Sequence, residues 1–580
     1  MNTFHPIQEI RDEIRRIICE KFPSCGDAEF RFEFPPTSEM GHLALACFPF
    51  SRVFKKKPEL ISAEIVSIDF SNNIQSARAI KGYVNFFINP TSLSHSLFNC
   101  LDKNQNFGNN EYGAGKRALI EFSSPNTNKP QHLGHARNNM IGFSLGNLFE
   151  LSGYQVIRVN LVNDRGIHIC KSMLAYKMFG GESTPESTNQ KGDFFVGDYY
   201  VKYFQESTSR PELEKEAQNM LVQWENGDED TKTLWEKMKK WVMDGFSATY
   251  ERMGICFDHF YFESDMYMGG KEEVLSALKK GVCQLEENGA VSIDLEDEGL
   301  GKKVLLRGDG TSVYITQDIH TSICKIKDFN PDLSLFVVGN EQENHFSVLF
   351  AVLKRFGYEW ADNCEHISYG MISLPEGKMK SREGTVVDLD SLLNDVKELA
   401  MDQLREREKE SIDKRSESEL LNAAEDISQA AIKFMILKSN SKKNIVFDPK
   451  ESISFEGMTG PYLQYTYARI CSLLRKSESE DWLAGYPEDH NWLPEESEML
   501  FMIAQLPEKV LAATCQRNPG LITGYAYDLG RLFNKYYYAN QIVRHSDINI
   551  KKARLALTVA VKHVLRKCLN IIGIKPLERM

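Results

Sequence analysis

The sequence contains no apolar stretch long enough to cross a membrane, which would need about 18 consecutive apolar residues. Its N-terminus, Met1-Asn-Thr-Phe-His-Pro6, has neither the basic start nor the apolar core of a signal peptide. The 12 cysteines are scattered without a Cys-x-x-Cys pair, which gives no support to a zinc knuckle or a disulfide framework. We therefore expect a cytoplasmic protein with reduced cysteines, no membrane partner and no bound metal.

The sequence also lacks an excess of basic residues, since its formal net charge is −12 at pH 7. This charge disfavours a protein whose whole surface coats nucleic acid, but it leaves room for local basic patches. The candidates are Lys55-Lys-Lys57, Lys442-Lys443 and the run from Lys551 to Lys567. The simpler interpretation of each one is a solvated face.

Length and pattern divide the 580 residues into several domains, with no internal repeat or low-complexity tract. Residues 1–110 predict a small α+β domain, and residues 111–390 predict a Rossmann-like parallel-sheet domain with a charged, helical insertion at about 170–290. Residues 391–455 predict a helical connector, and residues 456–580 a helical bundle. The predicted fold class is therefore α/β plus all-α.

Periodicity indicates individual elements within these domains. In the first domain, the spacing of isoleucines from Ile7 to Ile18 predicts a helix, and Phe30–Phe34 and Gly82–Ile88 predict strands. In the second, the sheet is expected to resume after Lys303, with buried strands at Ser312–Thr316, Leu333–Val338 and His366–Ser373, and a helix over His345–Phe356.

One βαβ unit stands out near the start of the second domain. The apolar run Ala118–Ile120, the amphipathic run Ala136–Leu151 and the strand pattern Gln155–Val162 follow one another within a short span. The turn before the helix carries His132, Gly134 and His135, and a helix N-terminus offers unpaired N–H groups to a phosphate. The unit therefore predicts a nucleotide site. Asp164, at the end of the second strand, is expected at the ligand-binding edge of the sheet.

A second segment supplies cations. The loop from Pro375 to Gly384 contains Lys378, Lys380 and Arg382. A triphosphate attacked at its α-phosphorus develops charge on the leaving pyrophosphate, which needs cations and N–H donors. Metal binding by the two histidines remains an alternative, although no cysteine or carboxylate partner is evident. Another is that the histidines only start a helix and that the cations lie on an exposed loop.

Together and in this order, the two segments resemble the His-x-Gly-His and Lys-Met-Ser-Lys-Ser motifs of class I aminoacyl-tRNA synthetases. The wider sequence resembles arginyl-tRNA synthetase over nearly the whole chain, most weakly between 170 and 290. The similar stretches are Phe122–His135, Asn160–Gly166, Asp309–Asp318, Val337–His345, Ser454–Arg469 and the terminal Leu577–Met580.

The resemblance implies an arginine site. It assigns Tyr314 and Asp318 to the guanidinium, whose planar fork needs paired acceptors. It assigns Glu121 and Gln342 to the α-ammonium group and Asn126 to the carboxylate side, with His132 at the boundary to ATP. From the residues alone, Asp318 would be interpreted as a helix N-cap.

The resemblance also implies an ATP site. The residues that it assigns to ATP are His132, Gly134, His135, Lys378, Met379, Lys380, Ser381 and Arg382. His132, His135, Lys378 and Lys380 would be catalytic. The loop departs from the class pattern because Ser381 stands where the second lysine is common, so we expect Lys129 to replace that lysine. Mg²⁺ would accompany ATP through phosphate oxygens, without a dedicated protein site.

For tRNA, the resemblance implies contacts at both ends of the chain. Asp528-Leu-Gly-Arg531 is similar to the Asp-Ala-Leu-Arg motif of a helical anticodon-binding domain. We expect Tyr462, Tyr465, Tyr537 and Arg531 to contact tRNA, because RNA loops stack on aromatic rings, although for any one ring a place in the core is the simpler interpretation. The N-terminal domain resembles the module that touches the tRNA elbow.

The implied activity is ATP-dependent attachment of L-arginine to tRNA(Arg) through an arginyl-adenylate, by a monomer that needs tRNA for activation. The alternative is a paralogue without acylation activity that acts as an RNA- or amino-acid-binding scaffold. Cysteinyl-tRNA synthetases use a zinc site that these cysteines do not provide. Stand-alone nucleotidyltransferases are usually shorter and lack an aromatic helical C-terminal domain.

Overall fold

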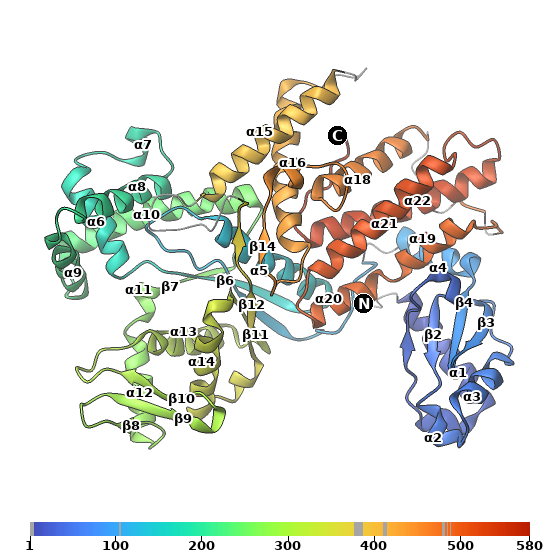
Figure 1. The fold of residues 1–580 in the computed structure, drawn as a ribbon, viewed down its shortest axis with the longest axis horizontal. Helices are drawn as coiled ribbons and strands as arrows, with labels where there is room; N and C mark the ends of the chain where they lie inside the picture. Colours follow the sequence, from blue (N-terminus) through green and yellow to red (C-terminus); the bar gives the residue numbers. More distant parts are fainter. Residues whose placement is uncertain are drawn as a thin grey trace.

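The computed structural model describes residues 5–103, 106–375, 387–409, 415–477, 482–483, 485–487 and 489–580. A parallel sheet lies at the centre of the molecule, with a group of helices on one side and the C-terminal helices on the other (Figure 1). The N-terminal domain lies beside the C-terminal helices (Figure 1). Within the described ranges, no helix is long and apolar enough to span a membrane.

The N-terminal domain packs helices against an antiparallel sheet with the strand order β1-β2-β4-β3. Its elements are α1 (Pro6–Lys21), η1 (Pro23–Asp27), β1 (Phe32–Glu33), η2 (Ser38–Met40), β2 (Leu43–Ala46), α2 (Phe50–Phe54), α3 (Pro58–Val66), β3 (Ile74–Ile80), β4 (Tyr83–Ile88) and α4 (Pro90–Lys103). The predicted helix and the strand at residues 82–88 are confirmed, whereas the strand predicted over 30–34 is only two residues long. Pro35 and Pro36 follow it directly, and proline has no N–H group for a sheet.

The second domain is built on a five-stranded, all-parallel sheet with the order β12-β11-β5-β6-β7. Its strands are β5 (Arg117–Glu121), β6 (Gln155–Val162), β7 (His259–Phe262), β11 (Leu333–Gly339) and β12 (Cys364–Tyr369). The main covering helices are α5 (Leu133–Leu151), α13 (Tyr314–Phe329) and α14 (Glu343–Arg355). The strand order reverses beside β5, and ligands bind at such a switch point, beyond the carboxyl ends of the strands.

The insertion begins after β6, but the sheet resumes earlier than expected. The inserted helices are α6 (Ile167–Phe179), α7 (Pro185–Thr188), α8 (Gly192–Ser207), α9 (Glu212–Glu225) and α10 (Glu229–Met253). β7 then pairs in parallel with β6, so the prediction that the sheet resumes after Lys303 is wrong. A four-residue strand is too short to show alternation. The segment continues through α11 (Glu263–Met266), α12 (Gly269–Lys279) and a small antiparallel sheet of β8 (Gln284–Leu285), β9 (Val291–Leu295) and β10 (Gly301–Leu306), with η3 (Glu296–Glu298) between the last two.

The strand predicted at Ser312–Thr316 is also wrong, because α13 begins at Tyr314. The β-branched Val313, Ile315 and Thr316 imitate a buried strand in the sequence. In the structure, the Thr316 hydroxyl group donates to the Leu305 carbonyl (2.5 Å) and accepts from the Val313 N–H (3.3 Å), which fixes the start of a helix. The predicted helix after β11 is confirmed as α14.

The remaining chain is mostly helical, as predicted. Its elements are η4 (Asn340–Gln342), η5 (Glu359–Asn363), β13 (Ile372–Ser373), α15 (Leu389–Glu408), α16 (Glu417–Leu437), β14 (Ile445–Val446), α17 (Pro449–Ser452), α18 (Gly460–Arg475), α19 (Pro494–Ala504), α20 (Leu506–Cys515), α21 (Gly520–Ala539) and α22 (Ile548–Ile571). The C-terminal helices α18 to α22 pack into a bundle that contacts α4 and α5.

Arg137 of α5 joins these layers. Its guanidinium group is fully buried and donates to the carbonyl oxygens of Met371 (2.8 Å), Ser441 (2.8 Å) and Lys443 (2.6 Å). Those carbonyls flank β13 and β14, which pair in parallel. Burial lowers the pKa of Arg137 to about 10, so the group stays charged at pH 7. The side chain therefore fixes both segments against the first turns of α5.

The close packing of α5 on β5 predicts a stability effect at Gly142. A Cβ atom there would lie 2.3 Å from Cγ of the buried Phe122, so we expect Gly142→Ala to destabilise the protein by about 1–3 kcal/mol. The matched variant is Gly524→Ala in α21, where a Cβ atom would meet nothing within 4 Å. That change should stabilise the helix by about 0.5–1 kcal/mol. Thermal unfolding followed by circular dichroism measures both, and equal midpoints would contradict the packing argument.

Candidate active site

The turn after β5 brings polar groups to the carboxyl edge of the sheet. Ser123 and Ser124 have φ angles of +82° and +47°, a left-handed conformation that costs non-glycine residues about 1–3 kcal/mol. The Ser123 N–H donates to Asn138 Oδ1 (2.6 Å), and the Ser124 N–H donates to Asn160 Oδ1 (3.1 Å). These two amide side chains stabilise the strained turn, which sets the direction in which the chain leaves the sheet.

At the other end of the turn, two imidazoles cap α5. His132 Nδ1 accepts from the Gly134 N–H (3.1 Å), and His135 Nδ1 accepts from the His132 N–H (3.1 Å). A neutral imidazole whose Nδ1 accepts carries its proton on Nε2, so each ring keeps one N–H donor for a ligand. A Cβ atom at Gly134 would lie 2.9 Å from Cε1 of His132, so glycine is needed there. The predicted histidine turn is thus also a helix cap.

Both imidazoles are neutral at pH 7. Burial, and then the charge of Lys129, lowers the pKa of His132 to about 4. Burial also holds the pKa of His135 well below its usual value, with His132 and Lys129 adding to the effect. Burial lowers the pKa of Lys129 itself. The start of α5 therefore combines two neutral donors with a nearby lysine, a combination suited to an anionic ligand.

Two acidic residues on other elements, Glu263 and Asp318, lie close to each other. Tyr314 and Asp318 lie four residues apart on α13, and therefore on one face of the helix. His345 Nε2 hydrogen-bonds to Asp318 Oδ2 (2.6 Å). Glu263, directly after β7, is buried, and burial followed by the charge of Asp318 raises its pKa to about 8. Two neighbouring carboxylates that repel each other form a site for a cation.

Sequence reasoning missed Glu263 and gave His345 no role. Glu263 follows β7, the strand that the sequence pattern did not reveal, so nothing marked it as the end of a strand. His345 ends the stretch Val337–His345 that resembles the family, but only the packing of α13 against α14 brings it to Asp318. For His345, the available signal was its place a few residues after the predicted strand Leu333–Val338, and for Glu263 the sequence offered none.

The other residues predicted to bind the substrate arginine lie at the same edge of the sheet. Glu121 is the last residue of β5, Asn126 forms an isolated bridge with Asn163, and Gln342 ends η4 just beyond β11. Glu121 is 5% exposed and makes an ion pair with Lys325 of α13, a partner that the sequence did not indicate.

Asp164 does not have the ligand-facing place that the sequence suggested. It is fully buried, and its carboxylate accepts from the Ser264 N–H (2.9 Å), the Ser264 hydroxyl group (2.7 Å) and Lys239 (2.6 Å). Its hydrogen-bonding capacity is used in joining β6 to α10 and α11. We therefore interpret Asp164 as a structural residue.

The residues of the cationic loop that were predicted to bind ATP lie outside the described residues. They are Lys378, Met379, Lys380, Ser381 and Arg382. The described residues on either side are anchored to α5 and to the turn before it. Arg137 binds the Met371 carbonyl on one side, and on the other the Leu389 N–H donates to the Gln131 carbonyl (2.8 Å). Across the described ranges, no three His, Cys, Asp or Glu side chains are grouped so as to hold a metal ion.

A separate groove of about 660 Å³ lies in the C-terminal bundle. Its lining includes Tyr465 and Tyr537, which were predicted, together with Arg469 and Tyr538, which were not. Arg469 donates to the hydroxyl groups of Tyr465 (3.1 Å) and Tyr538 (2.8 Å). Four further cations line the groove, namely Arg475, Lys476, Arg544 and Arg579.

The other two predicted tRNA residues lie outside the lining of this groove. Tyr462 is half-buried, and its hydroxyl group accepts from Asn534 (2.9 Å). Arg531 is exposed on α21 and pairs with Asp528 (3.7 Å). The spacing of the aromatic residues could not separate the rings that face the groove from those that pack inside the bundle.

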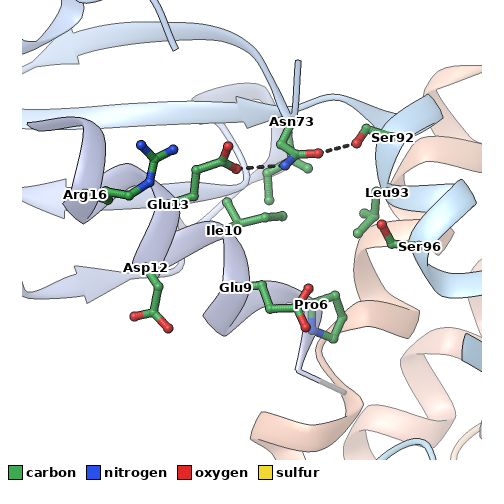
Figure 2. Close-up of a pocket in the computed structure, with 11 residues that line it drawn as sticks. Pro6, Glu9, Ile10, Asp12, Glu13, Arg16, Asn73, Ser92, Leu93 and Ser96 are labelled. Carbon is green, nitrogen blue, oxygen red and sulfur yellow. Dashed lines mark hydrogen bonds between the residues drawn. The ribbon is translucent and has the colours of Figure 1, made fainter. Parts of the chain in front are cut away.

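A hollow of about 400 Å³ in the N-terminal domain has the opposite charge. Figure 2 shows that Glu9, Asp12 and Glu13 of α1 line it together with Asn73 and Ser92. Asn73 Nδ2 donates to Glu13 Oε2 (2.7 Å). Three carboxylates against one arginine disfavour a phosphate backbone here, so this hollow does not suit RNA.

Known families match all three parts of the chain. The description "tRNA synthetases class I (R), catalytic domain" matches residues 96–449, "Arginyl tRNA synthetase N terminal domain" matches 7–88, and "DALR anticodon binding domain" matches 463–580. The chain belongs to the arginyl-tRNA synthetase family. The predicted family and fold class are confirmed.

Individual relatives of the chain belong to the same family. The arginine–tRNA ligase of Treponema denticola is 43% identical over 585 residues, covering 98% of each chain. That of Bacteroides thetaiotaomicron is 42% identical, covering 93% of this chain and 94% of the relative. The solved arginyl-tRNA synthetases of Thermus thermophilus and Plasmodium falciparum, each 22% identical, superpose with TM-scores of 0.84 and 0.79, covering 99% and 100% of this chain and 100% of theirs. They share its fold.

Proposed function

We propose that the chain attaches L-arginine to tRNA(Arg) with ATP, through an arginyl-adenylate. The observation that carries the proposal is the meeting of two opposite sites at one sheet edge. Neutral donors and Lys129 gather at the start of α5, whereas Glu263 and Asp318 form an acidic site beside α13. An amino acid with a cationic side chain needs the acidic site, and a triphosphate needs the donors and the lysine. The names of the relatives support the choice of arginine and tRNA.

The reaction needs positioning and electrostatics, and no covalent nucleophile. The arginine carboxylate oxygen attacks the α-phosphorus of ATP, a new P–O bond forms, and pyrophosphate leaves. The terminal ribose hydroxyl group of tRNA then attacks the arginyl carbonyl, and AMP leaves. His132 and His135 would donate their Nε2–H groups to phosphate oxygens, and Gly134 allows the close approach. Lys378, Met379, Lys380, Ser381 and Arg382 would complete the ATP site. Mg²⁺ would enter with ATP on its phosphate oxygens.

In this proposal, arginine lies along the sheet edge. Its guanidinium group would bind Asp318 and Tyr314, and Glu263 would supply a second carboxylate. Glu121 and Gln342 would bind the α-ammonium group, and Asn126 and His132 would lie near the carboxylate. The two carboxylates would then accept several N–H groups of the planar guanidinium. The ammonium group of lysine is a single charged centre and would pair with them less well.

The basic, aromatic groove in the C-terminal bundle would bind the anticodon end of tRNA. Tyr465 and Tyr537 offer surfaces on which unpaired bases can stack, and the surrounding arginines suit the backbone. Tyr462 and Arg531 would contact the RNA beyond the groove, and the N-terminal domain would contact the elbow through a face other than its acidic hollow. All 12 cysteines are free, which supports a location in the reducing cytoplasm. We expect the protein to be a monomer there. The scaffold alternative gains no support from the described residues.

ATP–pyrophosphate exchange with each of the 20 amino acids, with and without tRNA, tests the proposed function. We expect exchange with arginine alone, and only when tRNA is present if activation depends on it. Exchange with another amino acid would overturn the substrate. An absence of exchange under every condition would favour the scaffold alternative.

We expect Lys129→Ala to lower arginine-dependent exchange at least tenfold, which corresponds to about 1.4 kcal/mol. The reason is that Lys129 lies within electrostatic reach of both imidazoles and would neutralise the triphosphate. Lys116→Ala, an exposed lysine before β5, is the control and should leave the rate unchanged. A loss smaller than tenfold for Lys129→Ala would rule out this role.

We expect Glu263→Gln to raise KM for arginine roughly 10- to 150-fold, because a hydrogen bond between charged groups contributes about 1.5–3 kcal/mol. In the free enzyme, the Glu263 carboxyl group has a pKa of about 8 and must lose its proton before it binds a guanidinium. The wild-type kcat/KM for arginine should therefore rise with pH up to about 8 and then level off. Glu263→Gln should abolish this rise, and Glu272→Gln on α12 should preserve it. A variant profile that still rises would exclude Glu263 as the titrating group.

A further inference from the structure

A buried ion pair lies beneath the arginine site. Lys325 of α13 is 2% exposed, and its ammonium group pairs with Oε2 of Glu121 at the end of β5. Lys325 follows Asp318 by seven residues, or about two helical turns, so both lie on one stripe of α13 together with Tyr314. The helix that carries the proposed guanidinium ligands therefore also holds the carboxylate proposed for the other end of arginine.

Several of the groups near this pair are uncharged at pH 7. Lys325 Nζ lies 5.1 Å from the centre of the Phe336 ring. Burial raises the pKa of the Cys364 thiol on β12 to about 12, and burial also raises the pKa values of Cys324 on α13 and Tyr261 on β7. All three groups are neutral at pH 7. The Tyr261 hydroxyl group donates to Asp328 (2.8 Å), which is exposed on α13.

Lys325 consequently balances the charge of Glu121. A carboxylate in an apolar pocket without a cation or hydrogen bonds loses its hydration, and it takes up a proton instead. Removal of one partner from a buried ion pair leaves such an uncompensated charge. A protonated Glu121 could not form an ion pair with an α-ammonium group. With Lys325 on Oε2, the carboxylate keeps its charge and its second oxygen, Oε1, for a ligand.

We propose that Lys325 is a positioning residue for the α-ammonium group of the substrate, which holds Glu121 ionised and in one orientation without touching arginine itself. The inference rests on the proposed function, because it takes Glu121 as the ligand of that ammonium group. It assigns a role in substrate recognition to a side chain that is removed from solvent.

The test compares wild type, Lys325→Met and Lys325→Arg in arginine-dependent exchange, with 5-guanidinopentanoate as a competing ligand. This analogue has the guanidinium and carboxylate groups of arginine but lacks the α-ammonium group. We expect Lys325→Met to raise KM for arginine at least tenfold, while kcat and KM for ATP change less than threefold. Its inhibition constant for the analogue should match that of wild type. Lys325→Arg should restore KM for arginine to within threefold.

Lys327→Met is the matched control, because Lys327 is an exposed lysine two residues along α13. It should leave KM for arginine within threefold of the wild-type value.

Equal weakening of arginine and the analogue by Lys325→Met would mean that the pocket collapses, and it would overturn the proposal. So would an unchanged KM for arginine. If Lys325→Met does not fold, the comparison uses Glu121→Gln/Lys325→Met, which removes both charges. That variant should bind the analogue as wild type does and bind arginine at least tenfold more weakly, and any other result contradicts the proposal. Absence of arginine-dependent exchange in wild type would instead refute the proposed function.

Discussion

The geometry of this active site depends on how the chain leaves β5. Between Glu121 at the end of the strand and His132 at the start of α5, the backbone passes through two strained serines. The Oδ1 atoms of Asn138 on α5 and Asn160 on β6 accept the N–H groups of those serines, and their Nδ2 groups donate to other protein groups. The strain is thus offset inside the sheet, and it fixes the distance between the carboxylate at one end of the turn and the imidazoles at the other.

Burial then decides the charge at each end. At the start of α5, low pKa values keep His132 and His135 neutral. Each neutral imidazole can donate a hydrogen bond from its Nε2–H group without being protonated first. The ATP binding proposed for these groups should therefore be insensitive to pH between about 5 and 8. At the acidic end, burial acts in the opposite direction, since it keeps a proton on Glu263 until a cation arrives. The pH dependence of the reaction should arise from the amino-acid side of the site.

The sequence could predict what is local. Hydrophobic periodicity identified β5, α5 and β6, and motif spacing identified the residues at the edge of the sheet. The same reasoning failed at Ser312–Thr316, where β-branched residues begin a helix because Thr316 bonds to a carbonyl of β10. It failed at β7, which is too short to show a period and is defined by its pairing with β6. Each failure concerns a contact with another element of the structure, which the local pattern of residues does not contain.

The same limit explains why the sequence did not predict roles for Glu263, His345 and Lys325. None of them stands out by spacing, since each acquires its role from a partner on another element: Glu263 from Asp318, His345 from α13, and Lys325 from β5. Asp164 is the converse case, because its place at the end of a strand suggested a ligand, while Ser264 and Lys239 already occupy its oxygens. A position at the carboxyl edge of a sheet therefore identifies candidates, and the partners that saturate or polarise each side chain decide which of them remains available to a substrate.

The stripe on α13 connects these points. Asp318 and Lys325 are about 10 Å apart along a rigid helix, and one helps to form the acidic site while the other holds the carboxylate at the end of β5. In the proposed site, α13 therefore acts on both ends of the substrate, because it carries Asp318 for the guanidinium group and pairs through Lys325 with the carboxylate proposed for the α-ammonium group. Selection for the length of the substrate side chain should then depend on how this helix packs against β5.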